Sequence, residues 1–207
     1  MARPRTPDKP ARILQAAVKV FARKGYFAAR VSEIAREAKV ADGTIYLYFR
    51  NKEDILVSLF DRTMSEHILK GREELRCVRG VRASLQTIAE HHLRLLGGNR
   101  DLAVVFQVEL RQSTKFMERF TASWLKDYLA LVSQVIEEGQ RDGTLRRDLP
   151  RGLLTKAFFG ILDEMVTSWV LSRKRYDLGK EAAPVVDLLL RGAGASPARP
   201  DTRGRRG

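Results

Sequence analysis

Residues 31–49 read VSEIAREAKVADGTIYLYF, and this stretch decides the fold of the amino-terminal part of the chain. Small apolar residues recur in its first half at helical spacing: Ile34, Ala35 and Ala38. Ser32 suits the N-cap of this first helix, and Asp42 suits the N-cap of a second helix over residues 43–49, because their side-chain oxygens can accept from free backbone N–H groups. The stretch therefore predicts two short helices joined by a tight turn.

The second of these helices has an inward and an outward face. Ile45 and Phe49 are four residues apart and share the inward face, whereas Thr44 and Tyr48 share another face and Tyr46 points away from both. A short helix that buries one side and presents hydroxyl groups on the other is typical of the second helix of a helix-turn-helix, which lies in the major groove of DNA.

These positions define the expected DNA contacts. Thr44, Tyr46 and Leu47 are expected to reach the edges of the bases, and Ser32, Tyr48 and Lys52 are expected to contact phosphate groups. Asp42 and Gly43 lie at the start of the second helix, and they are also expected to take part in DNA binding. The pattern alone also allows two packed surface helices without any DNA partner.

The same stretch carries a family resemblance. Residues 42–49, DGTIYLYF, followed by Asn51-Lys52-Glu53-Asp54, resemble the signature of the TetR family of bacterial transcriptional regulators. The resemblance implies a DNA-binding regulator and not an enzyme. One position departs from the family pattern, because Lys39 occupies the turn where the family usually has glycine. If this position needs a positive φ, the lysine costs about 1 kcal/mol relative to glycine.

The charge of the chain is concentrated at its two ends. The 207 residues include 38 Lys and Arg against 25 Asp and Glu, a formal net charge of +13. Residues 1–52 hold 12 basic and 4 acidic side chains, residues 191–207 hold 5 and 1, and the long middle part is nearly balanced. Basic charge beside a helix-turn-helix favours binding to the phosphate backbone of DNA, because neutralised phosphates release counterions.

Several classes of protein are excluded by composition. Cys77 is the single cysteine, so the sequence predicts neither a disulfide framework nor a cysteine-based zinc site. No apolar run approaches the roughly 18 residues that a membrane span needs. No apolar signal core precedes Pro10, so we expect a cytoplasmic protein without a bound metal or cofactor.

The periodicity predicts an all-α chain of about nine helices in four parts. Residues 1–9 are expected to be a mobile basic arm, and 10–52 a DNA-binding domain with the helix-turn-helix at about 31–50. Residues 53–192 are expected to form a ligand-binding and dimerisation domain, followed by a disordered basic tail over 193–207. The expected helices begin at Pro10 and Asn51 in the amino-terminal part, and later cover 79–97, 100–113, 115–141, 151–174 and 179–191.

The second domain combines large apolar side chains with a few charges inside apolar stripes. Most of the apolar residues are expected to form ordinary core, and a hollow between the helices would be a natural ligand site. Arg111 either pairs with Asp163 or Glu164 or, with other arginines, meets an anionic ligand. The candidate ligand-binding residues are Arg94, Arg100, Phe106, Leu110, Arg111, Arg119, Trp124, Phe159, Leu162, Val166 and Trp169.

Three further motifs narrow the resemblance. Residues 109–113 (ELRQS), 160–164 (GILDE) and 176–178 (YDL) are similar to the FadR-type, acyl-CoA-responsive repressors of the TetR family in Bacillus and relatives, and the likeness spans about residues 11–190. This resemblance implies a homodimer that binds a palindromic operator, controls fatty-acid degradation genes and leaves DNA when a long-chain acyl-CoA binds. The apolar residues expected to form the dimer contact are Leu153, Leu154, Phe158, Val166, Val185, Leu188 and Leu189.

Three other functions remain open at this point. The first is a TetR-type regulator of an efflux system that senses amphiphilic drugs. The second is an enzyme acting on acyl thioesters, for which Glu90, His91 and His92 would be the candidates. They lack a nucleophile elbow or paired-histidine metal spacing, so we expect surface or interface histidines. The third is a basic protein that binds DNA without regard to sequence.

Overall fold

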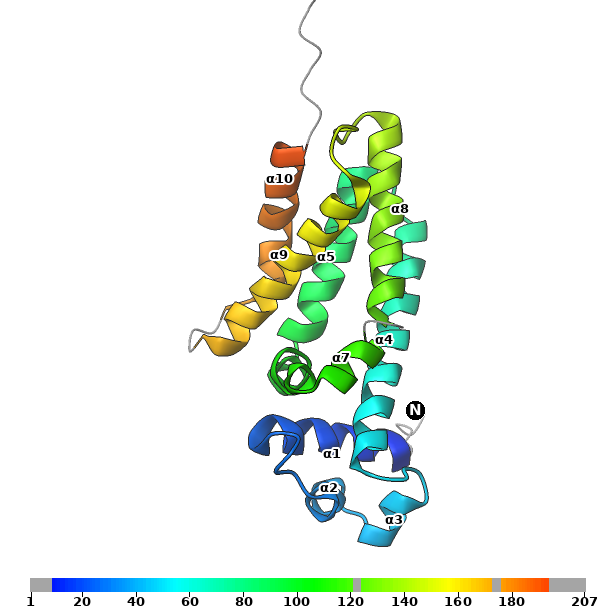
Figure 1. The fold of residues 1–207 in the computed structure, drawn as a ribbon, viewed down its shortest axis with the longest axis vertical. Helices are drawn as coiled ribbons and strands as arrows, with labels where there is room; N and C mark the ends of the chain where they lie inside the picture. Colours follow the sequence, from blue (N-terminus) through cyan, green and yellow to red (C-terminus); the bar gives the residue numbers. More distant parts are fainter. Residues whose placement is uncertain (1–8, 121–123, 173–175, 194–207) are drawn as a thin grey trace, which may run out of the picture.

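Two groups of helices lie end to end in the computed structural model, which describes residues 9–120, 124–172 and 176–193 (Figure 1). The head comprises the first three helices and their connections, and the body comprises everything from residue 52 onwards. The expected arm, apart from Lys9, and the expected tail from residue 194 lie outside the described residues. The helices of the head are α1 (Lys9–Lys24), α2 (Val31–Ala38) and α3 (Asp42–Tyr46).

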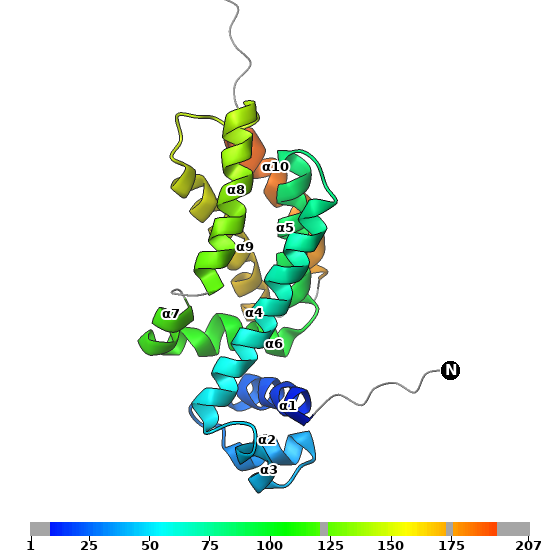
Figure 2. The same cartoon turned by 90° about the vertical axis from the view of Figure 1, so that its right-hand side faces the viewer.

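The body is built from longer helices around a central one. Its α-helices are α4 (Lys52–Arg76), α5 (Val81–Gly97), α6 (Arg100–Val104), α7 (Thr114–Phe120), α8 (Lys126–Asp142), α9 (Arg151–Leu171) and α10 (Ala182–Ala193). Helix α5 contacts α4, α8, α9 and α10, so it lies in the middle of the bundle (Figure 1), and Figure 2 shows α10 behind α5. Its buried face carries eight residues at helical spacing: Val81, Ser84, Leu85, Ile88, Ala89, His92, Leu93 and Leu96.

The fold class is all-α, as predicted, since the elements of the described ranges include no β-strand. These ranges contain ten α-helices instead of about nine, because one expected helix is divided into two, and another expected helix is α-helical only in its first part. The predicted helix 100–113 consists of α6, a π-helical segment η1 (Val105–Glu109) and a short 3-10 helix η2 (Leu110–Gln112). The predicted helix 115–141 consists of α7 and α8. Apolar spacing did not reveal the π and 3-10 segments within 100–113, because π and 3-10 turns differ from α turns by a single residue in their hydrogen bonding.

Several predicted helix ends are confirmed. Gly25 follows α1 with a φ of 79°, and Gly143 follows α8 with a φ of 84°, a conformation that glycine adopts at no steric cost. Asn51 caps α4, because its side-chain oxygen accepts from the backbone N–H of Asp54 at 2.8 Å. A short 3-10 helix, η4 (Leu178–Glu181), then leads into α10 and packs on α5.

The head and the body meet where α1 packs against α6 and η1. Glu109 is buried at this junction, and its carboxylate accepts a hydrogen bond of 2.6 Å from the backbone N–H of Tyr26. A side chain added at Gly25 would meet the same carboxylate at 3.4 Å. The π-helical segment of the body is thus bonded directly to the connection between α1 and α2.

Candidate functional site

The outer end of the head presents three consecutive side chains to solvent. Ile45 is fully buried and Phe49 is 6% exposed, so both pack inward as predicted. Between them, Tyr46, Leu47 and Tyr48 are 58%, 77% and 42% exposed. We call these three residues the tip. Large apolar and aromatic groups held in water on a rigid support are typical of a contact surface.

The helix caps of the head differ from the predicted ones. Helix α2 begins one residue before Ser32, its N-cap is Arg30, and the Glu33 carboxylate accepts from the Arg30 backbone N–H at 3.1 Å. Helix α3 is capped by Ala41, so Asp42 is its first residue. A carboxylate three residues into α2 already satisfies a free N–H group at its start, so no hydroxyl group is needed there. Ser32, Asp42 and Gly43 are exposed and Thr44 is half-buried, and α3 spans five residues where two turns were expected.

The turn between α2 and α3 has the backbone that glycine prefers. Lys39 has a φ of 55° and a ψ of 49°, and within the described ranges it is the one residue other than glycine with a positive φ. The backbone N–H of Val40 reaches the carbonyl of Ala35 at 3.0 Å, which is the bond of a Schellman motif. Lys39 therefore has the positive φ at which a lysine is strained relative to glycine.

Lys52 is engaged within the protein. Its ammonium group donates to the carbonyls of Phe27 and Ala29, both at 2.9 Å, and lies 4.7 Å from the centre of the Tyr26 ring. Partial burial lowers the pKa of Lys52 below its ordinary value. This placement argues against the predicted phosphate contact, because the side chain ties the start of α4 to the connection after α1. The exposed basic side chains of α2, the turn and the segment after α3 are better placed: Arg36, Lys39 and Arg50.

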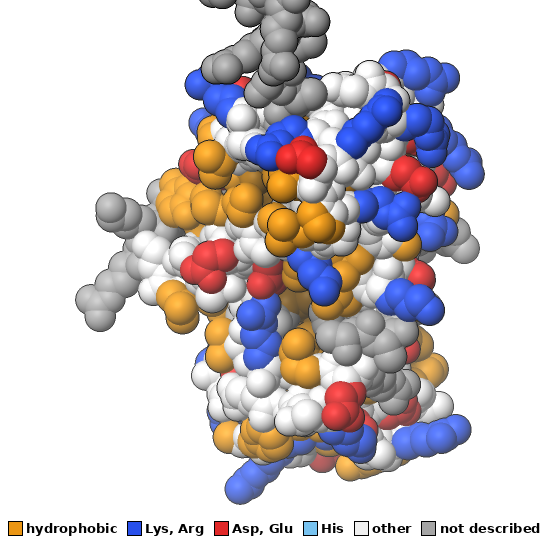
Figure 3. Space-filling view, turned by 45° about the horizontal axis from the view of Figure 1, so that its top comes forward, with side chains coloured by type: hydrophobic (Ala, Val, Ile, Leu, Met, Phe, Trp, Pro, Cys, Tyr) orange, Lys and Arg blue, Asp and Glu red, His pale blue; other side chains and the backbone are white. Residues whose placement is uncertain are grey.

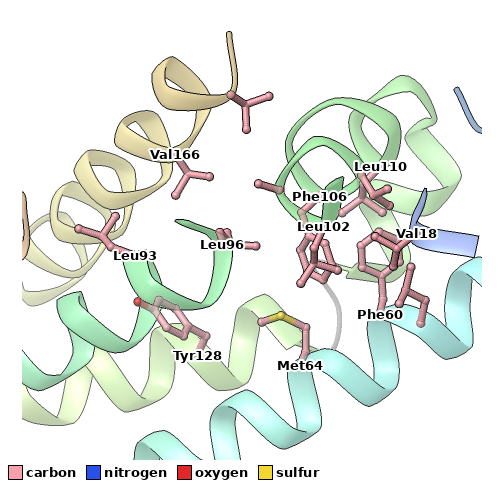
Figure 4. Close-up of a cluster of buried hydrophobic side chains, with 14 of the residues drawn as sticks. Val18, Phe60, Met64, Leu93, Leu96, Leu102, Phe106, Leu110, Tyr128 and Val166 are labelled. Atoms are coloured by element: carbon pink, nitrogen blue, oxygen red, sulfur yellow. The ribbon is translucent and has the colours of Figure 1, made fainter. Parts of the chain in front are cut away.

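A cavity of about 260 Å³ lies inside the body, between α4, α5, η1, α8 and α9. Figure 4 shows Met64, Leu96, Phe106 and Tyr128 approaching it from four different elements. Its wall is mainly apolar, with polar groups at a few points. The lining residues are Met64, His67, His92, Leu95, Leu96, Phe106, Gln107, Leu110, Arg111, Met117, Leu125, Tyr128, Phe159 and Asp163.

Four predicted ligand residues line this cavity: Phe106, Leu110, Arg111 and Phe159. Arg111 pairs with Asp163, which is one of the two ion-pair partners predicted for it. One guanidinium nitrogen lies 2.8 and 2.7 Å from the two carboxylate oxygens. Gln107 donates to the same carboxylate at 3.1 Å, and its own carbonyl oxygen accepts from Thr167. Arg111 is thus held on the cavity wall by a network from η1 and α9.

The other predicted ligand residues lie elsewhere. Leu162 and Val166 are fully buried in the core, and Trp124 donates from its indole N–H to Asp61 at 2.9 Å. Arg94 is exposed and pairs with Glu90. The side chain of Arg119 lies outside the described residues.

Arg100 bonds to the carboxyl end of α9. Its guanidinium donates to the carbonyls of Trp169, Val170 and Ser172 at 3.2, 2.7 and 2.8 Å, and it stacks on the ring of Trp169. Arg100 therefore satisfies the free carbonyls at the end of α9, where the helix dipole also favours a positive charge. This contact gives Arg100 and Trp169 a structural role, and their predicted roles in ligand binding stay predictions.

Three polar side chains from three helices line the cavity and are almost completely buried. His67, His92 and Tyr128 are 6%, 8% and 3% exposed. Within the described residues His67 Nδ1, His92 Nε2 and the Tyr128 hydroxyl have no hydrogen-bond partner. Burial lowers the pKa of His67 to about 3 and that of His92 to about 4, and it raises the pKa of Tyr128. All three side chains are therefore uncharged near neutral pH.

The sequence interpretation missed these groups. His91 and His92 were expected to be surface or interface residues, but His92 belongs to the buried face of α5 and His91 is only partly exposed. Helical spacing could have identified His67 and His92 as buried residues. His92 follows Ile88 by four residues, and His67 follows Met64 by three.

An open groove of about 980 Å³ runs along α4 and α5 and reaches α1 of the head. His67 and Leu95 line both the groove and the cavity, so they form a shared wall. Three basic side chains line the groove, namely Arg62, Lys70 and Arg94, and each lies beside a glutamate one helical turn away. Such exposed pairs contribute roughly 0–1 kcal/mol each, so their cations remain available to an anion.

Comparison with known proteins agrees with this arrangement of head and body. Residues 13–59 match the family model described as bacterial regulatory proteins of the tetR family, and residues 60–192 match the carboxy-terminal region of YsiA-like proteins. The chain belongs to the TetR family. TetR-family proteins are DNA-binding regulators and not enzymes, which confirms the prediction from the DGTIYLYF segment.

The chain is similar over most of its length to two regulators of fatty-acid metabolism. It is 41% identical over 180 residues to the fatty acid metabolism regulator protein of Bacillus subtilis strain 168, covering 87% of this chain and 93% of the relative. The crystal structure of the regulator FadR from B. subtilis in complex with stearoyl-CoA matches with 40% identity and a TM-score of 0.83, covering 88% and 98%. The fatty acid degradation regulator FadR from Bacillus halodurans matches with 42% identity, a TM-score of 0.82 and the same coverage.

These relatives favour a regulator of fatty-acid metabolism over a TetR-family regulator of an efflux system. In the described part of the chain, no helix has the length and apolar character needed to cross a membrane. The same part holds no cluster of three or more His, Cys, Asp or Glu side chains that could bind a metal ion.

Proposed function

We propose that this chain is a homodimeric repressor that binds a palindromic operator and is released from it by long-chain acyl-CoA, and that it controls genes of fatty-acid degradation. The observation that carries the proposal is the mainly apolar cavity in the body of a chain that is, over 88% of its length, about 40% identical to a protein solved with stearoyl-CoA. Such a repressor acts on the chromosome, which places it in the cytoplasm.

The head and the body have separate functions. Residues 10–52 form the DNA-binding domain and residues 53–192 the ligand-binding and dimerisation domain. Thr44, together with Tyr46 and Leu47 of the tip, contacts base edges, while Ser32 and Tyr48 contact phosphate groups. Asp42 and Gly43 lie at the start of α3, near the phosphate backbone. The exposure of Tyr46 and Leu47 supports this assignment, because a side chain must leave the protein surface to reach a base edge.

The acyl chain occupies the cavity, and the coenzyme A part lies in the groove. Apolar side chains such as Met64, Phe106 and Leu110 suit a hydrocarbon chain, and Arg62, Lys70 and Arg94 suit phosphates. Burying each CH₂ group contributes about 0.8 kcal/mol, so extending the chain by two carbons strengthens binding about tenfold until the cavity is full. The groove also reaches Leu14, Gln15 and Val18 of α1, so a bound head group contacts the DNA-binding domain.

Helices α9 and α10 form the dimer contact. Five of the seven residues expected there, Leu154, Phe158, Val166, Val185 and Leu189, are buried within the chain instead, because α9 and α10 pack against α5 and each other. Leu153 and Leu188 are 55% and 64% exposed, and a side chain at Gly160 would meet nothing within 4 Å. Figure 3 shows hydrophobic side chains gathered in the upper part of the molecule, over these helices. A partner helix can therefore approach α9 closely.

The dimer is tested by a charge on α10. Leu188→Glu is expected to give a monomer in sedimentation analysis, because the charge would be buried in the contact. The matched control is Leu69→Glu on α4, since Leu69 is 61% exposed and lies outside the proposed contact. A Leu188→Glu protein that remains dimeric would contradict this choice of surface.

The function is tested with purified full-length protein and an operator selected from random DNA. Acyl-CoA of increasing chain length is expected to release the operator at decreasing concentration in a gel-shift assay, while free fatty acid and coenzyme A alone are not. Replacing Arg62 or Arg94 by alanine should weaken the release, and Arg72→Ala, on α4 outside the groove, should not. Release by drug-like amphiphiles but not by acyl-CoA would overturn the proposal.

A further inference from the structure

The cavity contains polar groups that a plain hydrocarbon site does not need. The rings of His67, His92 and Tyr128 form a triangle, with centroid distances of 6.4 Å between the histidines, 5.5 Å between His92 and Tyr128 and 6.4 Å between His67 and Tyr128. We call these three residues the polar triad. Each contributes one buried polar atom without a partner among the described residues. Native proteins rarely leave such atoms unpaired unless a ligand or an ordered water uses them.

The chemistry of the triad restricts the group that it can bind. Tyr128 offers an O–H donor, and each neutral imidazole offers either a donor or an acceptor nitrogen. Asp163 lies on the same wall, and its charge acts on both His92 and Tyr128. Arg111, the cation of this wall, is already bonded to Asp163. An uncharged oxygen that accepts hydrogen bonds is therefore favoured, and a carboxylate is disfavoured.

The position of the triad indicates which part of a ligand reaches it. His67 lines both the apolar cavity and the charged groove. A ligand with a hydrocarbon chain in the cavity and a phosphorylated head in the groove must pass this residue. In an acyl-CoA, the thioester is the link between these two parts, and its carbonyl oxygen is an uncharged acceptor.

We infer that the polar triad of His67, His92 and Tyr128 binds the thioester carbonyl of the acyl-CoA where the cavity meets the groove. The inference rests on the proposed function and assigns the part of the site that recognises the thioester. It also predicts a preference for acyl-CoA over free fatty acid. A free acid would place its carboxylate among imidazoles that carry no positive charge, on a wall where the charge of Arg111 is already offset by Asp163.

The test compares two ligands that differ only at the carbonyl. Stearoyl-CoA has a thioester, and S-octadecyl-CoA has a CH₂ group in place of the carbonyl, so chain length and head group are the same. Calorimetric titration of the full-length protein is expected to show binding of the thioether about tenfold weaker or more, the effect of losing hydrogen bonds to buried groups.

The matched variant is Tyr128→Phe. It is expected to weaken stearoyl-CoA binding about tenfold and to leave thioether binding unchanged, because only the thioester uses the hydroxyl. Its melting temperature should not fall, since the variant removes a buried hydroxyl that has no partner in the described structure. The control is Tyr176→Phe, which removes an exposed hydroxyl outside the cavity and should leave binding of both ligands unchanged.

The outcomes separate the inference from the proposed function. Equal affinity of the wild-type protein for the two ligands would overturn the inference, would indicate that ordered water satisfies the triad, and would leave acyl-CoA as the effector. Full stearoyl-CoA affinity in Tyr128→Phe would overturn it as well. If the wild-type protein binds neither ligand, the proposed function fails together with the inference.

Discussion

The tip of the head and the cavity of the body each contain a tyrosine that is expected to bind a partner, but the two tyrosines lie in opposite environments. Tyr46 at the tip is 58% exposed, whereas Tyr128 in the cavity is 3% exposed. A hydrated hydroxyl costs nothing before its partner arrives, but a buried one without a partner lowers stability until a ligand or water supplies a bond. Substitutions at the tip should therefore change binding without changing stability, while substitutions in and around the cavity should affect both.

The largest expected effect is at the tip. Tyr46→Ala should reduce operator affinity by about 2–6 kcal/mol, because a dimer loses the base contact twice and each contact contributes about 1–3 kcal/mol. Its melting temperature and its dimer should be unchanged. A gel-shift titration measures the affinity, and Tyr176→Ala in the body is the matched control. An unchanged operator affinity would remove Tyr46 from the DNA contact and leave the comparison between the two tyrosines without support.

The next effect concerns pH and the buried histidines. The folded-state pKa values of His67 and His92 are about 3 and about 4, below the ordinary 6.5, because burial disfavours their charged forms. As pH falls below 6.5 the unfolded chain takes up protons first, so the free energy of unfolding decreases by about 1.4 kcal/mol per pH unit for each histidine. The window extends from pH 6.5 down to about 4 for His92 and about 3 for His67.

Urea unfolding at pH 7.0 and pH 5.5 measures this loss. His92→Asn should remove about half of the change in unfolding free energy with pH if the histidines act independently. The charges of His91, Lys70 and Asp163 also affect the pKa values of this pair. A free energy of unfolding that stays constant between these pH values would mean that the cavity already accommodates charged imidazoles. The contrast between a hydrated tip and a dry cavity would then be wrong.

The junction between head and body should show a somewhat smaller effect. Glu109→Ala leaves the buried backbone N–H of Tyr26 without its acceptor, which costs about 2 kcal/mol of unfolding free energy. The matched control is Glu138→Ala on the exposed side of α8, expected to change stability by less than about 0.5 kcal/mol. Equal stabilities of the two variants would show that this bond does not couple η1 to the head.

The smallest effect is expected at the turn of the helix-turn-helix. Lys39→Gly should raise the free energy of unfolding by about 0.5–1 kcal/mol, because glycine adopts the observed positive φ without steric cost. Lys39→Ala is the control and should bring no such gain, since alanine carries the same Cβ. A gain from alanine equal to that from glycine would assign the effect to the removed charge and not to the backbone.

Local patterns made much of the head predictable. Ile45 and Phe49 were assigned to the inside from their spacing alone, and both are buried. Gly25 and Asn51 were assigned to helix ends because their chemistry suits a stop and a cap, and both are found there. The Ser32 and Asp42 caps were wrong because Glu33 and the backbone of Ala41 serve these ends instead.

The cavity was predictable only in part. Phe106, Leu110, Arg111 and Phe159 were recognised as large or charged groups on apolar helices and do line it. Arg100 resembled them in sequence, yet it bonds to carbonyls about 70 residues away along the chain. No local pattern distinguishes an arginine that caps a distant helix from one that awaits a phosphate.

The sequence by itself determined the all-α fold, the faces of the head helices, the family and the concentration of positive charge around the helix-turn-helix. These features depend on residues within one or two helical turns of each other, or on composition. The tertiary structure alone decided that Asp163 holds Arg111 across 52 residues and that His67, His92 and Tyr128 meet around one cavity. Such contacts depend on how whole helices pack, and the spacing of residues within a single helix does not show which other helix it will pack against.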